Sequence, residues 1–372
     1  MTGILSASII VAILTSVLAL IITIVDSIVN NYGEVNININ NGTKELKVDG
    51  GSPLLFTLAE QGIFIPSACG GKGSCGACKV KILSDVGPIL PTESPLLTDE
   101  EKKSKIRLSC QVKVKSNISI EIPEELFYVK QYKAKVEKIN NVTHDIKEVY
   151  IKLKNPDNIE FKAGQYAQIV VPPYGKIKES TQRAYSISSA PKDNSHVEFL
   201  IRLVPGGIAT TYVHDFLKEN QDVEVVGPFG DFFMRETKAD MVCVAGGSGM
   251  APIKSIIYDM YEKEILDREI WYFFGARSLK DLYYIEEFKE LSKKMPNLHF
   301  IPALSDPMDE DNWEGETGLI TDVLDKYLKT KLNPEHEREG YLCGSPGMID
   351  ACVKVMTSND ISEEKIYYDK FA

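Results

Sequence analysis

Residues 67–78 read SACGGKGSCGAC and concentrate three cysteines and four glycines in twelve residues. With the later Cys110 they form the pattern Cys69-x5-Cys75-x2-Cys78-x31-Cys110. This is close to the plant-type run C-x4-C-x2-C…C of a [2Fe–2S] cluster, with one extra residue in the first gap. Because glycine tolerates positive φ, the loop could fold over a cluster and aim amides at its sulfurs. We therefore expect these four cysteines to be metal ligands.

Two other uses of such a loop fit the residues less well. A phosphate-binding loop of the G-x-x-x-x-G-K-[ST] type needs Ser or Thr after its lysine, but Lys72 is followed by Gly73. Structural zinc usually takes two separated Cys or Cys/His pairs. Cys75 and Cys78 make one such pair, and Cys69 and Cys110 do not make a second. The iron–sulfur interpretation is therefore favoured.

The residues around the loop predict a small α+β domain over residues 33–126. Alternating apolar residues in 34–50, EVNININNGTKELKVDG, indicate two strands, and Asn41-Gly42 is typical of a two-residue hairpin turn. Residues 53–61 are expected to form a short helix, residues 79–83 a strand, and residues 112–122 one or two more strands.

The pattern of expected strands and helices changes twice more along the chain. Residues 127–236 are rich in strands, and six of these would form an antiparallel barrel with one helix at 209–218. Five of the six strands are expected at 133–139, 148–154, 166–171, 184–189 and 197–204. In residues 237–372, short buried strands alternate with amphipathic helices, which predicts an open α/β domain with a parallel sheet. Its strands are expected at 241–247, 270–276, 298–304 and 340–345, and its helices at 252–266, 281–294 and 321–329.

The N-terminal residues 1–32 are expected to anchor the chain in a membrane. Ile4 to Val25 are 22 residues without a charge or a proline, enough for a helix of about 33 Å across a hydrocarbon core of about 30 Å. A signal peptide would need a basic start and a shorter apolar core. All Lys and Arg lie after the run, which favours a single pass with the remaining domains on the cytoplasmic side of the inner membrane. Asp26 would then rest at the interface.

Charge and compartment limit the partners and the cysteine chemistry. The chain has 42 basic and 53 acidic residues and no basic stripe, so nucleic acid is not expected as a partner. Thiols on the cytoplasmic side stay reduced. The seven cysteines (69, 75, 78, 110, 243, 343 and 352) are therefore poor candidates for disulfides.

Two further motifs complete a resemblance that covers essentially the whole chain. Arg183-Ala184-Tyr185-Ser186 matches an R-x-Y-[ST] flavin motif, and Gly247-Ser248-Gly249-Met250-Ala251-Pro252 matches G-x-G-x-x-P. With the cysteine spacing and the anchor, the chain resembles the F subunits of Na⁺-translocating NADH:quinone oxidoreductases. It also resembles, more loosely, the reductase components of bacterial oxygenases. Between Tyr166 and Arg183 the chain is shorter than in the F subunits.

The resemblance implies an FAD site in the barrel. Arg183 would pair with the flavin pyrophosphate, Tyr185 would lie against the isoalloxazine ring, and Ser186 would hydrogen-bond near N5. Gly207, Thr210 and Thr211 open the expected helix, whose N-terminal amides and dipole favour the pyrophosphate.

The resemblance also implies an NADH site in the C-terminal domain. The nucleotide pyrophosphate would lie on Gly247, Gly249 and Pro252. Cys343 and Gly344, in a C-G-x-P motif, would lie near the nicotinamide and flavin N5. The penultimate Phe371 would stack on the flavin. Asp306 stands where an NADPH-binding arginine would be, and Arg277 could compensate for it.

The expected function is an NADH dehydrogenase subunit. Electrons would pass from NADH to FAD, then to the [2Fe–2S] cluster, then to integral-membrane partner subunits and finally to a quinone such as ubiquinone. Ser186, Cys343 and Phe371 would act at the hydride step, and the five histidines are given no role. Two alternatives remain: a membrane-tethered reductase feeding an oxygenase or other iron protein, and an electron carrier that does not oxidise nucleotide. The sequence does not decide whether Na⁺ is transported.

Overall fold

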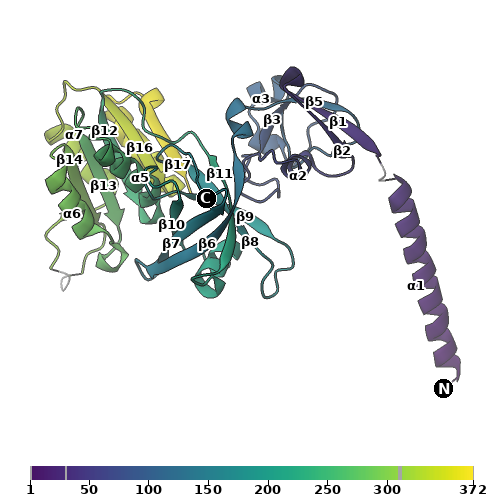
Figure 1. The fold of residues 1–372 in the computed structure, drawn as a ribbon. Coiled ribbons are helices and arrows are strands. Elements are labelled where there is room, and N and C mark those ends of the chain that lie inside the picture. Colours follow the sequence, from purple (N-terminus) through teal and green to yellow (C-terminus); the bar gives the residue numbers. More distant parts are fainter. Residues whose placement is uncertain (1, 30–31, 309–311, 372) are drawn as a thin grey trace. The chain divides into compact units, whose positions relative to one another are not determined.

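The computed structural model describes residues 2–29, 32–308 and 312–371. The chain forms two compact units, Met1–Val129 and Lys130–Ala372. The fold class expected from the sequence holds for the three regions that follow the N-terminal helix, each of which forms its own sheet (Figure 1).

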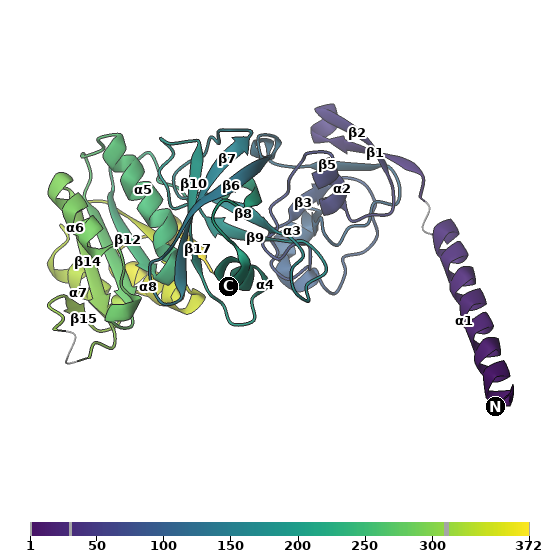
Figure 2. The ribbon, with the colours of Figure 1, turned by 60° about the horizontal axis from the view of Figure 1, so that its bottom comes forward.

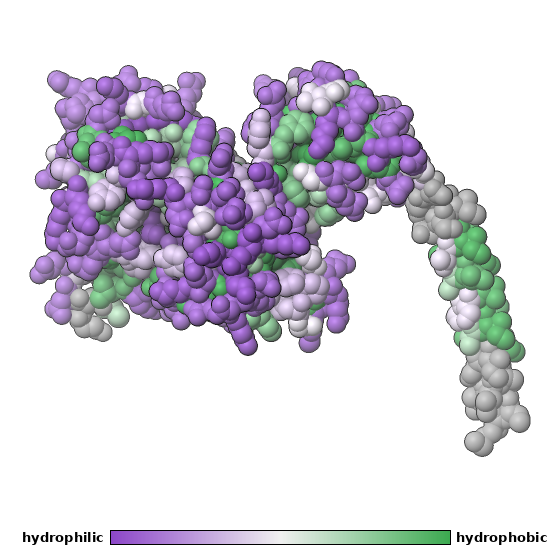
Figure 3. All heavy atoms as spheres, viewed as in Figure 1, coloured by the Kyte–Doolittle hydropathy of each residue, from purple (hydrophilic) through white to green (hydrophobic). Residues whose placement is uncertain are grey.

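The first element is the helix α1 (Thr2–Val29). Over residues 10–25 its described side chains are exposed and mostly apolar, and they form a green surface in Figure 3. Within the part of the chain that the structure describes, no helix is both long enough and apolar enough to cross a membrane. The N-terminal anchor therefore stays a prediction.

The rest of the first unit is a five-stranded sheet in the order β2-β1-β5-β3-β4. β1 and β5 run parallel, and the other neighbours run antiparallel. Its strands are β1 (Glu34–Ile39), β2 (Lys44–Asp49), β3 (Lys79–Ile82), β4 (Ile106–Leu108) and β5 (Ile118–Glu121), and its helices are α2 (Leu54–Glu60) and α3 (Asp99–Lys103). The alternation of apolar residues puts Val35, Ile37 and Ile39 in the core, as expected for a half-buried strand.

The hairpin between β1 and β2 is wider than predicted. Ile39 pairs with Lys44, so four residues make the turn rather than Asn41 and Gly42 alone. Asn40 and Asn41 both adopt positive φ, at 50° and 55°. The Asn40 side chain hydrogen-bonds the backbone N–H and C=O of Ile122 at 2.9 Å each, which ties the turn to the end of β5. Asparagine tolerates this conformation, and its long-range partner is invisible to a local turn rule.

The second unit begins with a six-stranded antiparallel sheet in the order β10-β7-β6-β11-β8-β9. An isolated bridge between Ile187 and Phe199 joins its two ends, just beyond β9 and within β10. The strands are β6 (Lys130–Asn141), β7 (Ile146–Asn155), β8 (Tyr166–Val171), β9 (Thr181–Ser186), β10 (His196–Arg202) and β11 (Asp222–Phe229). The helix expected at 209–218 is α4 (Ile208–Thr211) followed by a π-helical turn (Tyr212–Phe216).

The C-terminal part of the second unit is an all-parallel sheet in the order β15-β14-β13-β12-β16-β17 (Figure 2). Its strands are β12 (Asp240–Gly246), β13 (Ile270–Ala276), β14 (Leu298–Leu304), β15 (Glu316–Thr317), β16 (Arg338–Gly344) and β17 (Ile366–Lys370). Helices α5 (Met250–Glu262) and α6 (Ile285–Lys294) pack on one face, and α7 (Ile320–Thr330) and α8 (Pro346–Ser358) pack on the other. Both faces are covered, which explains the continuous apolar runs.

Candidate functional site

The cysteine loop brings its four thiols together in two pairs. Cys75 Sγ lies 3.4 Å from Cys69 Sγ, and Cys78 hydrogen-bonds Cys110. Cys78 and Cys110 are buried, whereas Cys75 is exposed. None of the seven cysteines, all of which the structure describes, forms a disulfide.

Within each pair, the two thiols differ in pKa. Burial opposes ionisation of Cys69, but hydrogen bonds from Ser74 and Cys75 lower its pKa to about 6. The hydrogen bond from Cys78 lowers the pKa of Cys110 to about 7. The pKa of Cys78 is raised because its thiol donates that bond, and burial raises the pKa of Cys75. Each pair therefore has one thiol that ionises readily, as a thiolate ligand must.

This arrangement fits a [2Fe–2S] cluster better than a single ion. In the described residues, no three His, Cys, Asp or Glu side chains are placed to hold one metal ion. Two pairs of thiols suit a cluster of two irons with four cysteine ligands. Gly70, Gly71, Gly73 and Gly76 in the loop all have positive φ, between 68° and 85°. Ser67 Oγ accepts from the Gly71 N–H at 2.9 Å and holds the loop in this shape.

The flavin motif lies on β9 of the antiparallel sheet. Arg183 is half-buried, and its Nη1 donates to Thr181 Oγ1 at 2.8 Å and to the Gln182 carbonyl at 2.7 Å. The Tyr185 ring meets Phe199 edge-on, with centroids 6.5 Å apart, and burial raises the pKa of Tyr185. Both side chains are thus held in place by neighbouring groups.

The predicted pyrophosphate turn is held by its own backbone and by Thr210. The Thr211 N–H donates to the Gly207 carbonyl at 3.0 Å. Thr210 Oγ1 accepts from the Val204 N–H at 3.2 Å. Since α4 has only four residues before the π-helical turn, the helix-dipole part of the sequence argument is weakened.

The residues assigned to the hydride step meet at the end of β16 and β17. Ser186 Oγ donates to Asp369 Oδ2 at 3.4 Å, and Asp369 is the register partner of Cys343. The Phe371 N–H donates to the Gly344 carbonyl at 2.9 Å. Ser186, Cys343, Gly344 and Phe371, which are far apart in sequence, are therefore brought into one neighbourhood.

Asp369 was missed by the sequence reasoning. Burial raises its pKa, while the hydrogen bond from Ser186 opposes the rise. Burial and the nearby Asp369 raise the pKa of Cys343 well above its usual range. Cys343 is therefore a neutral thiol and not a nucleophilic thiolate. The only local signal for Asp369 was its position two residues before Phe371.

The glycine loop after β12 approaches β16 very closely. A Cβ on Gly249 would lie 2.2 Å from the Cys343 carbonyl oxygen and 2.6 Å from its carbon. Gly247 has a φ of 55°, and its missing Cβ faces Arg202 Nη1 at 3.3 Å. Pro252 is buried in the first turn of α5. Glycine at 249 is required by space, and glycine at 247 by conformation.

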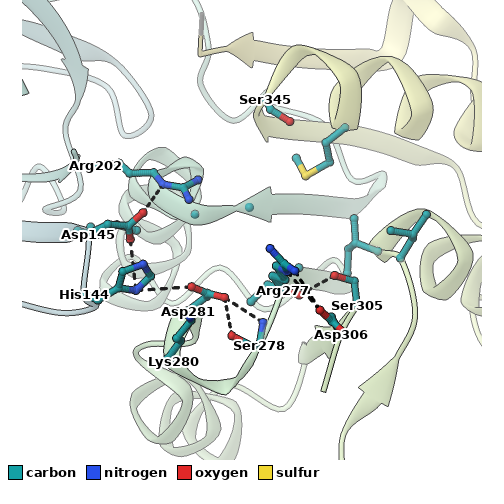
Figure 4. A pocket seen from close by; sticks show the side chains of 18 of the residues that line it. His144, Asp145, Arg202, Arg277, Ser278, Lys280, Asp281, Ser305, Asp306 and Ser345 are labelled. Atoms are coloured by element: carbon teal, nitrogen blue, oxygen red, sulfur yellow. Dashed lines mark hydrogen bonds and ion pairs between the residues drawn. The ribbon is translucent and has the colours of Figure 1, made fainter. Parts of the chain in front are cut away.

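A pocket of about 640 Å³ opens beside this loop at the carboxyl ends of β12, β13, β14 and β16. In parallel α/β sheets, ligands bind at this edge, where the strand order reverses on either side of the first strand. Of the predicted residues, Gly247, Arg277 and Asp306 line the pocket. Arg277 Nε and Nη2 each lie 3.3 Å from Asp306 Oδ2, and the pair is largely exposed (Figure 4).

Comparisons with known proteins agree with this geometry. Residues 37–115 match a 2Fe-2S iron-sulfur cluster binding domain, 133–234 an oxidoreductase FAD-binding domain, and 243–354 an oxidoreductase NAD-binding domain. The F subunit of the Na(+)-translocating NADH-quinone reductase of Klebsiella pneumoniae is 39% identical over 92% of both chains. The corresponding protein of Neisseria meningitidis is 37% identical over 95% of this chain and 96% of its own. The chain belongs to the family of F subunits of Na⁺-translocating NADH-quinone reductases.

Solved structures with the same architecture come from other electron-transfer systems. This chain matches an Amycolatopsis cytochrome P450 reductase with a TM-score of 0.71 and 28% identity, over 91% of this chain and 98% of that one. It matches a ferredoxin reductase of carbazole 1,9a-dioxygenase with a TM-score of 0.68 and 25% identity, over 91% and 99%.

The pocket also receives side chains from the end of β10 and from the loop that joins β6 to β7. Arg202 Nε donates to Asp145 Oδ2 at 2.7 Å, and His144 Nδ1 lies 3.7 Å from Asp281 Oδ1 (Figure 4). Burial opposes ionisation of Asp145, but the Arg202 hydrogen bond keeps its pKa below the usual value. The sequence reasoning missed all four residues, because no local pattern indicates which side chains of the two sheets will meet at this pocket.

Proposed function

We propose that this chain oxidises NADH and delivers the electrons, through bound FAD and a [2Fe–2S] cluster, to the membrane subunits of a quinone reductase. The observation that carries the proposal is the meeting of Ser186, Asp369 and Cys343 beside the Gly247–Gly249 loop. Through β17 and β16, this links the strand proposed to bind flavin to the loop proposed to bind nucleotide, on a chain that also has a four-cysteine site.

When bound, FAD supplies the step from two-electron hydride transfer to one-electron transfer, and the cluster supplies the one-electron exit. Arg183 would hold the flavin pyrophosphate, with Gly207, Thr210 and Thr211 lining the same turn. Tyr185 would cover the ring. Ser186 would lie near N5, and its hydroxyl, which donates to Asp369 in this structure, would turn to hydrogen-bond there. The cluster would be held by Cys69 and Cys75 on one side and by Cys78 and Cys110 on the other.

In the nucleotide pocket, the same residues would bind and orient NADH. Gly247 and Gly249 would let the backbone approach a pyrophosphate closely, and Pro252 lies in the first turn of the helix that follows. Arg202 adds a positive charge beside Gly247. Cys343, as a neutral thiol, and Gly344 would border the nicotinamide, and Phe371 would cover the flavin until nicotinamide replaces it.

The direct test is an anaerobic titration of the FAD- and iron-loaded protein with NADH, followed by visible absorption. We expect the flavin and cluster bands to bleach together. A protein that binds FAD and iron but is not reduced by NADH would be a carrier only, and the proposed function would be wrong.

A second candidate function is supported by the solved structures. The likeness to a cytochrome P450 reductase and to a dioxygenase reductase favours, as the alternative, a reductase that feeds an oxygenase. Purification in gentle detergent separates the two. Co-purifying multi-span subunits and a quinone acceptor support the first candidate, and a co-purifying iron oxygenase supports the second.

The membrane attachment belongs to the same proposal. Residues 4–25 carry no charge, and their described part is an exposed apolar helix surface. We propose that they hold the chain in the inner membrane by a single pass, with residues 33–372 on the cytoplasmic side.

Deletion of residues 1–30 tests the anchor. We expect the shortened chain to stay in the supernatant when membranes are sedimented, because the apolar run is removed. FAD and cluster absorption should be unchanged, because all proposed ligands lie after residue 60. A shortened chain that still sediments with membranes from cells lacking the partner subunits would contradict the anchor.

Nucleotide preference tests the roles of Asp306 and Arg277. A carboxylate beside the ribose would repel the 2′-phosphate of NADPH, and its ion pair occupies Arg277. We expect NADH to be preferred by at least about tenfold in kcat/KM, equivalent to about 1.4 kcal/mol. Asp306→Arg should narrow the preference, because it frees Arg277 and adds a second cation.

The control for that variant is Asp267→Arg. It makes the same change of charge at the opposite edge of the sheet, where Asp267 pairs with Lys238. It should leave the preference unchanged. Wild-type protein that uses NADPH as well as NADH would remove the role given to Asp306.

A further inference from the structure

A buried cluster of charged groups lies where the antiparallel sheet packs against the helices of the parallel sheet. At its centre Lys254 Nζ, on α5, donates to Glu198 Oε1, on β10, at 2.9 Å. Glu198 is 4% exposed and Lys254 is 7% exposed. Neither residue belongs to the motifs assigned to FAD or NADH.

A second carboxylate lies on the same sheet face. Glu198 pairs with Tyr150 in the β10–β7 register, and Glu148 is two residues before Tyr150, so the two carboxylates share a face. Glu148 is 5% exposed and accepts hydrogen bonds from Asn140 and from the Tyr284 hydroxyl. Lys254 Nζ also lies 5.1 Å from the centroid of the Tyr284 ring.

Such a cluster adds little net stability to the fold. Removing an ammonium and two carboxylates from water costs free energy that their attraction only partly returns, and apolar side chains of the same volume often serve as well. The charged groups instead fix how the two sheets are arranged, because their hydrogen bonds are satisfied in only one arrangement of the sheets. We therefore expect the cluster to fix the relative position of the two sheets.

The cluster joins the two halves of the site. Ser188, two residues after Ser186, donates from Oγ to Glu198 Oε1 at 2.5 Å. Ser255, next to Lys254, donates from Oγ to the Ser189 carbonyl at 2.7 Å. The end of the flavin strand is thus bound to the first turns of α5, the helix that starts at the glycine loop.

We propose that Lys254 and Glu198 are positioning residues for hydride transfer. They hold α5 and the nucleotide loop at a fixed separation from β9, and so set the distance between the nicotinamide and the flavin. The inference rests on the proposed function. Neither side chain touches the reacting atoms, but a displacement of about 1 Å from the productive geometry can cost about a hundredfold in rate.

Stopped-flow reduction of the FAD-loaded full chain by NADH measures this directly. For Lys254→Met we expect the limiting rate of flavin bleaching to fall by about 10- to 100-fold. The NADH concentration for half-maximal rate should change less than about threefold, because the binding residues are intact. The long-wavelength charge-transfer band of reduced flavin with NAD⁺ should weaken, since it depends on ring stacking. Lys254→Arg should retain most of the rate.

The double variant Lys254→Met, Glu198→Leu separates position from stability. Because both charges are gone, its thermal stability should recover toward wild type while flavin reduction stays slow. Lys329→Met, which removes an exposed ion pair with Asp325 on α7, is the matched control and should change neither.

Recovery of the rate together with stability in the double variant would overturn the positioning role. So would a rate within about twofold of wild type in a folded, FAD-bound Lys254→Met protein, since positioning requires a larger loss. If wild type itself is not reduced by NADH, the proposed function fails instead.

Discussion

Cys75→Ala is expected to abolish the [2Fe–2S] absorption and to leave FAD bound. Cys75 is the most exposed of the four thiols and lies 3.4 Å from its partner Cys69, so its loss leaves one side of the site with a single ligand. The flavin residues belong to the other compact unit and are untouched. NADH oxidation with a dye that accepts directly from flavin should therefore persist, while transfer to an acceptor that takes electrons from the cluster falls to background.

Cys352→Ala is the matched control for this variant. Cys352 is buried in α8, apart from the loop, and the variant should keep both cofactors and both activities. A folded, FAD-bound Cys75→Ala protein that no longer oxidises NADH with the dye would contradict the order in which electrons leave the flavin.

Gly249→Ala is expected to produce the second large loss, at the nucleotide site. Gly249 has an ordinary helical φ of −60°, so its backbone tolerates alanine, but the added methyl would meet backbone atoms of Cys343 at 2.2 and 2.6 Å. Backbone cannot rotate away as a side chain can, so the loop and β16 must separate. We expect NADH-dependent flavin reduction to fall by about a hundredfold or more.

Dithionite should still reduce the flavin of Gly249→Ala, because the residues proposed to hold FAD lie on β9 and not on this loop. The control is Gly347→Ala in α8, where the new methyl meets nothing within 4 Å. That variant should be neutral or slightly more stable, since alanine is favoured over glycine in a helix. Normal NADH kinetics in Gly249→Ala would mean that the close approach to β16 is not needed for the nucleotide site.

Local patterns account for most of the fold and for part of the site. Most strands of the three sheets follow from alternation and from buried runs, because these reflect how many faces of a strand are covered. The strands β4, β15 and β17 and the helix α8 were not among the expected elements. The gathering of the four cysteines was predictable because all but one of them lie within ten residues.

The remaining site residues depend on packing between distant segments. Asp369 reaches Ser186, 183 residues away, only because β17 adds to the sheet beside β16. His144, Asp145 and Arg202 enter the pocket because one end of the antiparallel sheet meets the parallel sheet. No sequence window contains both partners of these contacts. The prediction of a two-residue turn was wrong for the same reason, since the Asn40 side chain in the observed turn bonds to the distant Ile122.

The division of the chain at Val129 and Lys130 has a thermodynamic consequence. Each unit has its own apolar core, and each would bind a different redox group. Two such units need not unfold in one cooperative step, so a single melting temperature is not defined for the whole chain. Ligands stabilise only the unit they bind. Iron loading should move one calorimetric transition and FAD the other, and heating a partly loaded sample reports which unit lacks its cofactor.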